Sequence, residues 1–244
     1  MSARIKAFVV HLIGSIILAA CALVMVFLVW YPAPLEQALG VTHIFLLMLG
    51  IDVILGPILT LIIFKKNTRL LKIDLTIIIV VQLIVFSYGL ATVAKGRPAW
   101  LVFSTDQFYL VRVADVESQK AALAPADYSH VPWLGPRWVA VRLPDTQEQR
   151  RQLVSETLSA GGGLFSSPNL YSPIETASAK IQKKARTLAE LKQYNSPQVI
   201  QTTLTQWPTA TKWLPLWTNA AGATVLLNKN NEVVSIVPLN PWKQ

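Results

Sequence analysis

Few side chains in this sequence are of the types that carry out catalysis or bind metals. Among its 244 residues it has one cysteine and three histidines, at positions 11, 43 and 130, which excludes an internal disulfide and a cysteine-based zinc finger. Ser129 and His130 form the one Ser–His pair outside the apolar segments. The motifs G-x-S-x-G, H-E-x-x-H and Walker A are absent. We therefore predict no catalytic, cofactor-binding or metal-binding residues, and a hydrolytic site at His130 stays an open alternative.

Asp52 offers a different kind of chemistry, because it is the single charged residue in an apolar segment from about residue 43 to residue 64. A carboxylate inside a bilayer costs several kcal/mol unless it is paired, protonated or hydrated. Gln82 is expected at a similar depth in an antiparallel segment. One interpretation is therefore an Asp52–Gln82 hydrogen bond that joins two helices, worth about 1 kcal/mol. The alternative is a role of Asp52 in partner binding or proton transfer.

Small residues and a proline surround Asp52. Gly50 and Gly56 are small enough to allow close contact between membrane helices. Pro57 cannot donate a hydrogen bond to the carbonyl of Val53, so a kink is expected there. Together with Asp52 and Gln82, these residues are the candidate intramembrane contacts.

Three segments are long and apolar enough to place these residues in a membrane: about 7–30, 43–64 and 75–94. Roughly 20 apolar residues cross a hydrocarbon core of about 30 Å as a helix. Charged residues make up 14% of the chain, against about 25% in an ordinary soluble domain. We predict a membrane protein with three N-terminal transmembrane helices in residues 1–97, followed by a mixed α+β periplasmic domain in residues 98–244.

The basic residues near the spans predict the orientation. Arg4 and Lys6 precede the first span, and residues 65–72 carry four more basic residues, whereas residues 31–42 carry none. Basic loops stay in the cytoplasm, so the N-terminus is expected inside and residues 98–244 in the periplasm of a bacterial inner membrane. The net charge of +9 is then explained in part by basic residues beside the membrane spans, so the expected partner is the lipid bilayer and nucleic acid is not expected.

A lipoprotein signal is the rival interpretation of the first span. Residues 18–21, Leu-Ala-Ala-Cys, match a lipobox. A lipidated Cys21 should lead into a polar chain, but residues 22–30 continue the apolar run. We therefore expect a full span in which Cys21 is a small helix residue.

The remaining residues alternate between strand and helix patterns, which is typical of an α+β domain. One apolar stripe at helical spacing predicts a single helix from Ile174 to Leu191. Strands are expected at 100–103, 108–113, 137–143, 213–217, 224–228 and 232–238, and further helices at 115–122, after 144, and at 196–206.

Two groups of residues in this domain are candidate partner surfaces. Lys183 and Lys184 belong to a basic run that is either a solvated helix face or a contact with anionic lipid or an acidic partner. Seven of the eight tryptophans lie from residue 100 onward. Trp100 and Trp133 are candidates among them because tryptophan is enriched in binding hot spots.

Several motifs together resemble the TfpX/TfpZ family of type IV pilin accessory proteins. The similarity covers most of the chain and is densest in residues 1–115. Its motifs are R-x-K-A-F at 4–8, W-Y-P-A-P at 30–34, G-V-T-H-I-F at 40–45, G-I-D-V-I-L-G-P-I-L-T at 50–60, K-I-D-L-T at 72–76, G-R-P-A-W-L-V-F at 96–103 and N-P-W at 240–242.

This resemblance implies an inner-membrane accessory protein that works with a cognate major type IV pilin and with other pilus assembly components. It implies no catalytic residues. Two other classes remain open. One is a membrane-anchored periplasmic enzyme, either a hydrolase or a pilin-modifying transferase. The other is a sensor with a periplasmic input domain, which the short inside segments argue against because they leave no room for an output domain.

Overall fold

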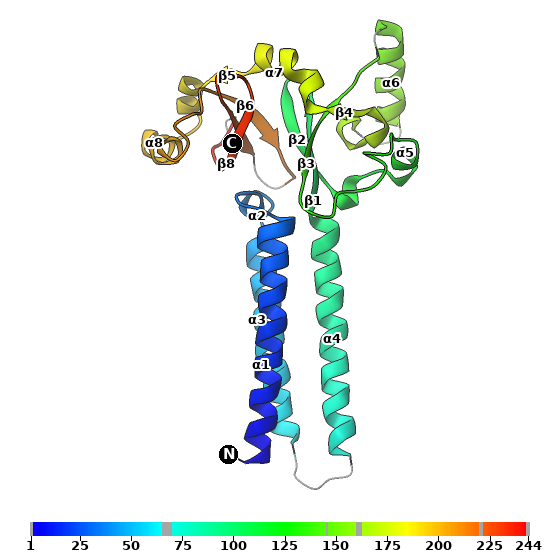
Figure 1. Cartoon of the computed structure of the whole chain (residues 1–244), viewed down its shortest axis with the longest axis vertical. Coiled ribbons are helices and arrows are strands. Elements are labelled where there is room, and N and C mark those ends of the chain that lie inside the picture. The colour runs from blue at the N-terminus through cyan, green and yellow to red at the C-terminus, as the bar shows by residue number, and fades with distance from the viewer. Residues whose placement is uncertain (1, 65–69, 145, 160–162, 220–221, 243–244) are drawn as a thin grey trace. The chain divides into compact units, whose positions relative to one another are not determined.

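The computed structural model describes residues 2–64, 70–144, 146–159, 163–219 and 222–242 (Figure 1). The chain forms two compact units. One unit comprises residues 1–32 and 40–96, and the other comprises residues 33–39 and 97–244. The predicted orientation depends on Arg4, Lys6 and four basic residues in the segment 65–72; three of those four, at positions 65, 66 and 69, lie outside the described residues.

The first unit consists of three long apolar helices. They are α1 (Ala3–Val24), which continues as a π-helical segment over Met25–Trp30, α3 (Val41–Ile63) and α4 (Leu71–Gly96). With their continuation they are 28, 23 and 26 residues long, each sufficient to cross a bilayer. Many of their Ile, Leu and Val side chains are exposed, as expected for a surface whose solvent is lipid. The predicted fold class is thereby confirmed for this part of the chain.

The helix α3 is the centre of this unit, because it packs against both α1 and α4 (Figure 1). On the α1 side, the Phe27 and Phe45 rings meet edge to face with centroids 5.7 Å apart. At the end of the first span, the Tyr31 hydroxyl donates a hydrogen bond of 2.8 Å to the Val93 carbonyl of α4. The first and third spans therefore both pack on α3 and are also joined to each other directly.

The second unit is built on a mixed sheet whose described strands follow the order β4-β3-β1-β2-β6-β7-β8, with β5 paired to β6. β1 pairs antiparallel with β2 and parallel with β3, and β2 pairs parallel with β6. The strands are β1 (Pro98–Ser104), β2 (Gln107–Arg112), β3 (Arg137–Val141), β4 (Tyr171–Pro173), β5 (Arg186–Thr187), β6 (Lys212–Trp217), β7 (Ala223–Leu227) and β8 (Val233–Val237). This layout confirms the predicted α+β class, and a strand lies at each of the six predicted strand positions.

The side chains of the central strand β1 contribute to two separate hydrophobic cores, because successive side chains of a strand point to opposite faces of the sheet. Leu101 and Phe103 join the first core, whereas Trp100 and Val102 join the second. A third core forms around Trp213. The helices that accompany the sheet are α5 (Ser118–Ala122), α6 (Gln147–Ser159), α7 (Ser178–Lys184) and α8 (Pro197–Thr205).

The short segment between the first two spans belongs to the second unit. It forms α2 (Leu35–Ala38), and both Leu35 and Ala38 are buried in the first core. The Thr218 hydroxyl also donates a hydrogen bond of 3.3 Å to the Ala38 carbonyl. A segment that reads as a simple connection is therefore part of the soluble domain.

The predicted single helix from Ile174 to Leu191 is wrong. The helix α7 ends at Lys184, and the next residues form β5, which pairs with β6. The Trp213 indole donates a hydrogen bond of 2.8 Å to the Thr187 carbonyl, and the Arg186 guanidinium lies 5.2 Å from the Trp213 ring. The apolar residues at 174–191 have the spacing of a continuous helix, but pairing of β5 with β6 is a tertiary contact, and it prevails over this local pattern.

Candidate functional site

A polar cluster at the centre of the membrane bundle connects all three spans through Gln82 of α4. The Gln82 Oε1 atom lies 2.9 Å from His11 Nε2 of α1. Its Nε2 atom donates to Ser15 Oγ of α1 at 3.3 Å and to the Asp52 backbone carbonyl of α3 at 2.8 Å. Because the amide nitrogen faces a carbonyl oxygen, the orientation of the amide is fixed by its partners.

The same network determines the tautomer of His11. Gln82 Oε1 can only accept, so a neutral His11 ring carries its proton on Nε2. His11 Nδ1 then accepts from the Thr60 hydroxyl of α3, 2.7 Å away. Each of these polar atoms is satisfied inside the unit, which is what a lipid environment requires. His11 therefore joins the spans, a role that its position in the sequence leaves undefined.

The expected side-chain hydrogen bond between Asp52 and Gln82 is wrong in one respect. Gln82 bonds the Asp52 backbone carbonyl and not its carboxylate. The carboxylate atom Oδ2 is buried and has no hydrogen-bond partner among the described residues. The Gln82 amide makes its hydrogen bonds to side chains of α1 and to a backbone carbonyl of α3. The Asp52 carboxylate therefore takes no part in the hydrogen bonds of Gln82 that join the helices.

The two glycines of α3 differ in their surroundings. Gly56 is buried, and a methyl group at this position would overlap the Gln82 amide. At Gly50, no atom of the described residues lies within 4 Å of the position that a methyl group would take, apart from the chain neighbours and the backbone of the same helix. Pro57 lies inside α3 and is buried beside Gly56. Gly56 thus makes room for the polar cluster, whereas Gly50 leaves open space outside the helix.

A groove of about 550 Å³ lies between the three spans. Apolar side chains line most of it, and the polar residues at its walls include His11, Ser15, Asp52, Thr60 and Gln82. On α1 the groove reaches from Lys6 to Ala19. The sequence-predicted residues Asp52 and Gln82 are therefore brought together at one groove, and Gly50 is not part of its lining.

In the second unit, the proposal of Trp100 as a partner-surface residue is wrong, because its side chain is 0% exposed. Its ring meets those of Tyr128 and Tyr171 edge to face, with centroids 5.9 and 5.5 Å away. Trp100 lies on the fully buried central strand β1, so it stabilises the second core. The enrichment of tryptophan in hot spots does not distinguish it from a core residue.

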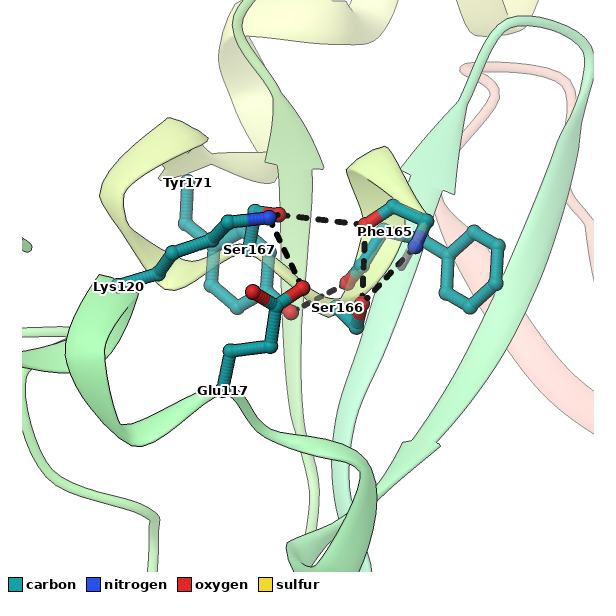
Figure 2. Close-up of polar contacts among 7 residues, drawn as sticks. Glu117, Lys120, Phe165, Ser166, Ser167 and Tyr171 are labelled. Carbon is teal, nitrogen blue, oxygen red and sulfur yellow. Dashed lines mark hydrogen bonds and ion pairs between the residues drawn. The ribbon is translucent and has the colours of Figure 1, made fainter. Parts of the chain in front are cut away.

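Figure 2 shows how a loop is fastened over this second core. Lys120 Nζ contacts Glu117 Oε1 at 2.8 Å and Ser167 Oγ at 3.1 Å, and the Tyr171 hydroxyl donates to the Phe165 carbonyl. Burial raises the pKa of Tyr171 well above its usual range, so the hydroxyl remains a donor. These contacts fasten the loop to the second core.

Trp133 is an exposed candidate, since 57% of its surface is accessible. The Arg97 guanidinium lies 4.8 Å from its ring centroid, and Arg97 also donates a hydrogen bond of 3.2 Å to the Pro132 carbonyl. Lys183 and Lys184 are exposed at the end of α7. A helix C-terminus favours basic residues in any case, so their position does not by itself indicate a partner.

The Ser129–His130 pair is exposed, with Ser129 Oγ 2.9 Å from His130 Nδ1. The same hydroxyl donates a hydrogen bond of 2.9 Å to the Ala126 carbonyl. A serine nucleophile must instead give its proton to the neighbouring base. The geometry in this structure is therefore that of a loop contact.

Comparison with known proteins finds similarity to fimbrial assembly proteins. The family model for the fimbrial assembly protein FimB matches residues 1–40. Two relatives come from Dichelobacter nodosus. The fimbrial assembly protein of serogroup I is 31% identical over 183 residues, which cover 74% of this chain and 71% of the relative. That of serogroup E1 is 28% identical over 243 residues, which cover 96% and 94%. No solved structure matches the chain.

Proposed function

The chain belongs to the family of fimbrial assembly proteins, and from that premise we propose that it is an inner-membrane accessory protein that binds a cognate type IV pilin and promotes or modulates its assembly into pili. A role in fimbrial assembly follows from the family itself. The match to the serogroup E1 relative over nearly its whole length carries the proposal, because both units of this chain are then shared with a fimbrial assembly protein. The motifs that resemble the TfpX/TfpZ family support the same partner.

The architecture supports contact with a subunit that is still in the membrane. A pilin before assembly has a membrane helix and a periplasmic head, as the resemblance implies. Three spans and a folded soluble domain in one chain offer a surface to each part. The names of the relatives agree with an accessory role, so we propose stoichiometric contact and not turnover. The membrane-anchored enzyme is the competing class.

Deletion of the chain tests this function. We expect surface pili made from the cognate pilin to fall severalfold, and to recover when the chain is supplied from a plasmid. The measurement is the yield of sheared pili, with total pilin measured in parallel. A strain that carries an unrelated pilin is the control. Normal piliation with the cognate pilin would contradict the proposal, and an equal loss with both pilins would remove pilin specificity.

The proposed orientation has its own test. Alkaline phosphatase is active only outside the cytoplasm, so a fusion after residue 244 should be active and a fusion after Lys66 inactive. The physical reason is the retention of basic segments on the cytoplasmic side. Activity of each fusion is normalised to its abundance. The reverse pattern would overturn both the orientation and the periplasmic position of the second unit.

A further inference from the structure

We propose that the groove between α1, α3 and α4 is the docking site for the single membrane helix of the pilin, and that the Asp52 carboxylate contacts a hydrogen-bond donor on that helix. The inference rests on the proposed function and adds the place of contact. Its first support is the arrangement of the spans. Because α3 packs against both α1 and α4, the groove has a helix at its base and one on each side.

The dimensions of the groove suit a helix. Its wall on α1 runs from Lys6 to Ala19, which corresponds to about 20 Å at 1.5 Å per residue. That length is more than half of a hydrocarbon core of about 30 Å. A fourth helix placed in this groove would convert the three spans into a four-helix arrangement.

Small residues on α1 allow such a helix to come close. Ala7 and Gly14 both line the groove. Apart from its chain neighbours and the backbone of its own helix, no atom of the described residues lies within 4 Å of the position that a methyl group at Gly14 would take. The groove therefore has open space at Gly14, and small residues are what close approach of membrane helices requires.

Asp52 distinguishes a protein helix from lipid as the occupant. Its Oδ2 atom is buried without a hydrogen-bond partner among the described residues, and the residue lines the groove. Acyl chains bring no donor, so lipid would leave this oxygen unsatisfied at the cost that membranes impose on such groups. A helix with a donor at this depth would satisfy it.

The test compares two substitutions on α1, Gly14→Leu in the groove and Ala20→Leu on an exposed position outside its lining. The full-length chain is purified after crosslinking in membranes, and the pilin that accompanies it is measured. We expect Gly14→Leu to lower pilin recovery about tenfold and Ala20→Leu to leave it unchanged. Asp52→Leu should lower recovery as well, since the donor loses its partner.

Folding is controlled separately, because a misfolded variant would also lose pilin. A photo-crosslinking residue is placed at Val10, which lines the groove, or at Ile16, which helical spacing puts on the opposite face of α1; they are 70% and 49% exposed. A pilin adduct from Val10 and none from Ile16 supports the proposal. Adducts from Ile16 alone, adducts of a second copy of the chain from Val10, or full pilin recovery by Gly14→Leu would each overturn it. If the unmodified chain captures no pilin, the proposed function itself is wrong.

Discussion

Replacing Gly56 with alanine should destabilise the membrane unit by about 1–3 kcal/mol, the usual cost of overpacking a filled site. The new methyl group would overlap the Gln82 amide and displace it from Ser15 and the Asp52 carbonyl. The effect should be visible as lower abundance of the chain in membranes and as earlier thermal unfolding in detergent.

Gly50→Ala is the matched control for this prediction. It is the same substitution in the same helix, and outside the backbone of that helix its methyl group meets no atom of the described residues within 4 Å. Alanine is the better helix former by about 1 kcal/mol, so Gly50→Ala should be neutral or slightly stabilising. Equal losses at both positions would refute the packing role of Gly56.

A double-mutant cycle identifies the partner of Gly56. If the alanine acts by displacing the Gln82 amide, Gly56→Ala should cost little in a chain that already carries Gln82→Ala. Losses that simply add would show that Gly56 acts through another neighbour. The single variant Gln82→Ala should itself lower stability, because each intramembrane hydrogen bond contributes about 0.6–2 kcal/mol.

Leu35→Ala should destabilise the soluble unit by about 2–5 kcal/mol, the range for a leucine removed from a core. Leu35 is 2% exposed and packs in the first core, although it comes from the segment between two spans. The measurement is thermal or denaturant unfolding of the full-length chain in detergent, followed by the fluorescence of the tryptophans, most of which lie in this unit.

Leu123→Ala is the control, since Leu123 is 78% exposed in the same unit. Surface substitutions of this kind change stability by no more than about 0.5 kcal/mol. An unchanged unfolding transition for Leu35→Ala would mean that residues 33–39 are not part of the core. A separate soluble fragment starting at Arg97 lacks these residues, so it should be less stable than the unit in the full-length chain.

The sequence by itself determined the spans and most of the strands. Apolar stretches of at least 20 residues with at most one charged residue can cross a bilayer only as helices. Residue types that favour strands likewise predict strands such as those at 224–228 and 232–238. Both patterns are local, so they can be recognised without knowing which other residues lie nearby. The lack of catalytic motifs and the position of a charged Asp52 within an apolar stretch can also be recognised from the sequence without knowing which residues lie nearby in space.

Only the tertiary structure decided which side chains meet. The rotation of each helix about its axis determines whether Gln82 faces the Asp52 carboxylate or its backbone, and no local pattern encodes that rotation. Helical spacing in residues 174–191 fits a helix, yet pairing with β6 ends it at Lys184. Tryptophan is a residue type that often anchors a partner, but Trp100 lies on the central strand β1 and is buried. Residues distant in sequence cover both faces of the sheet at this strand.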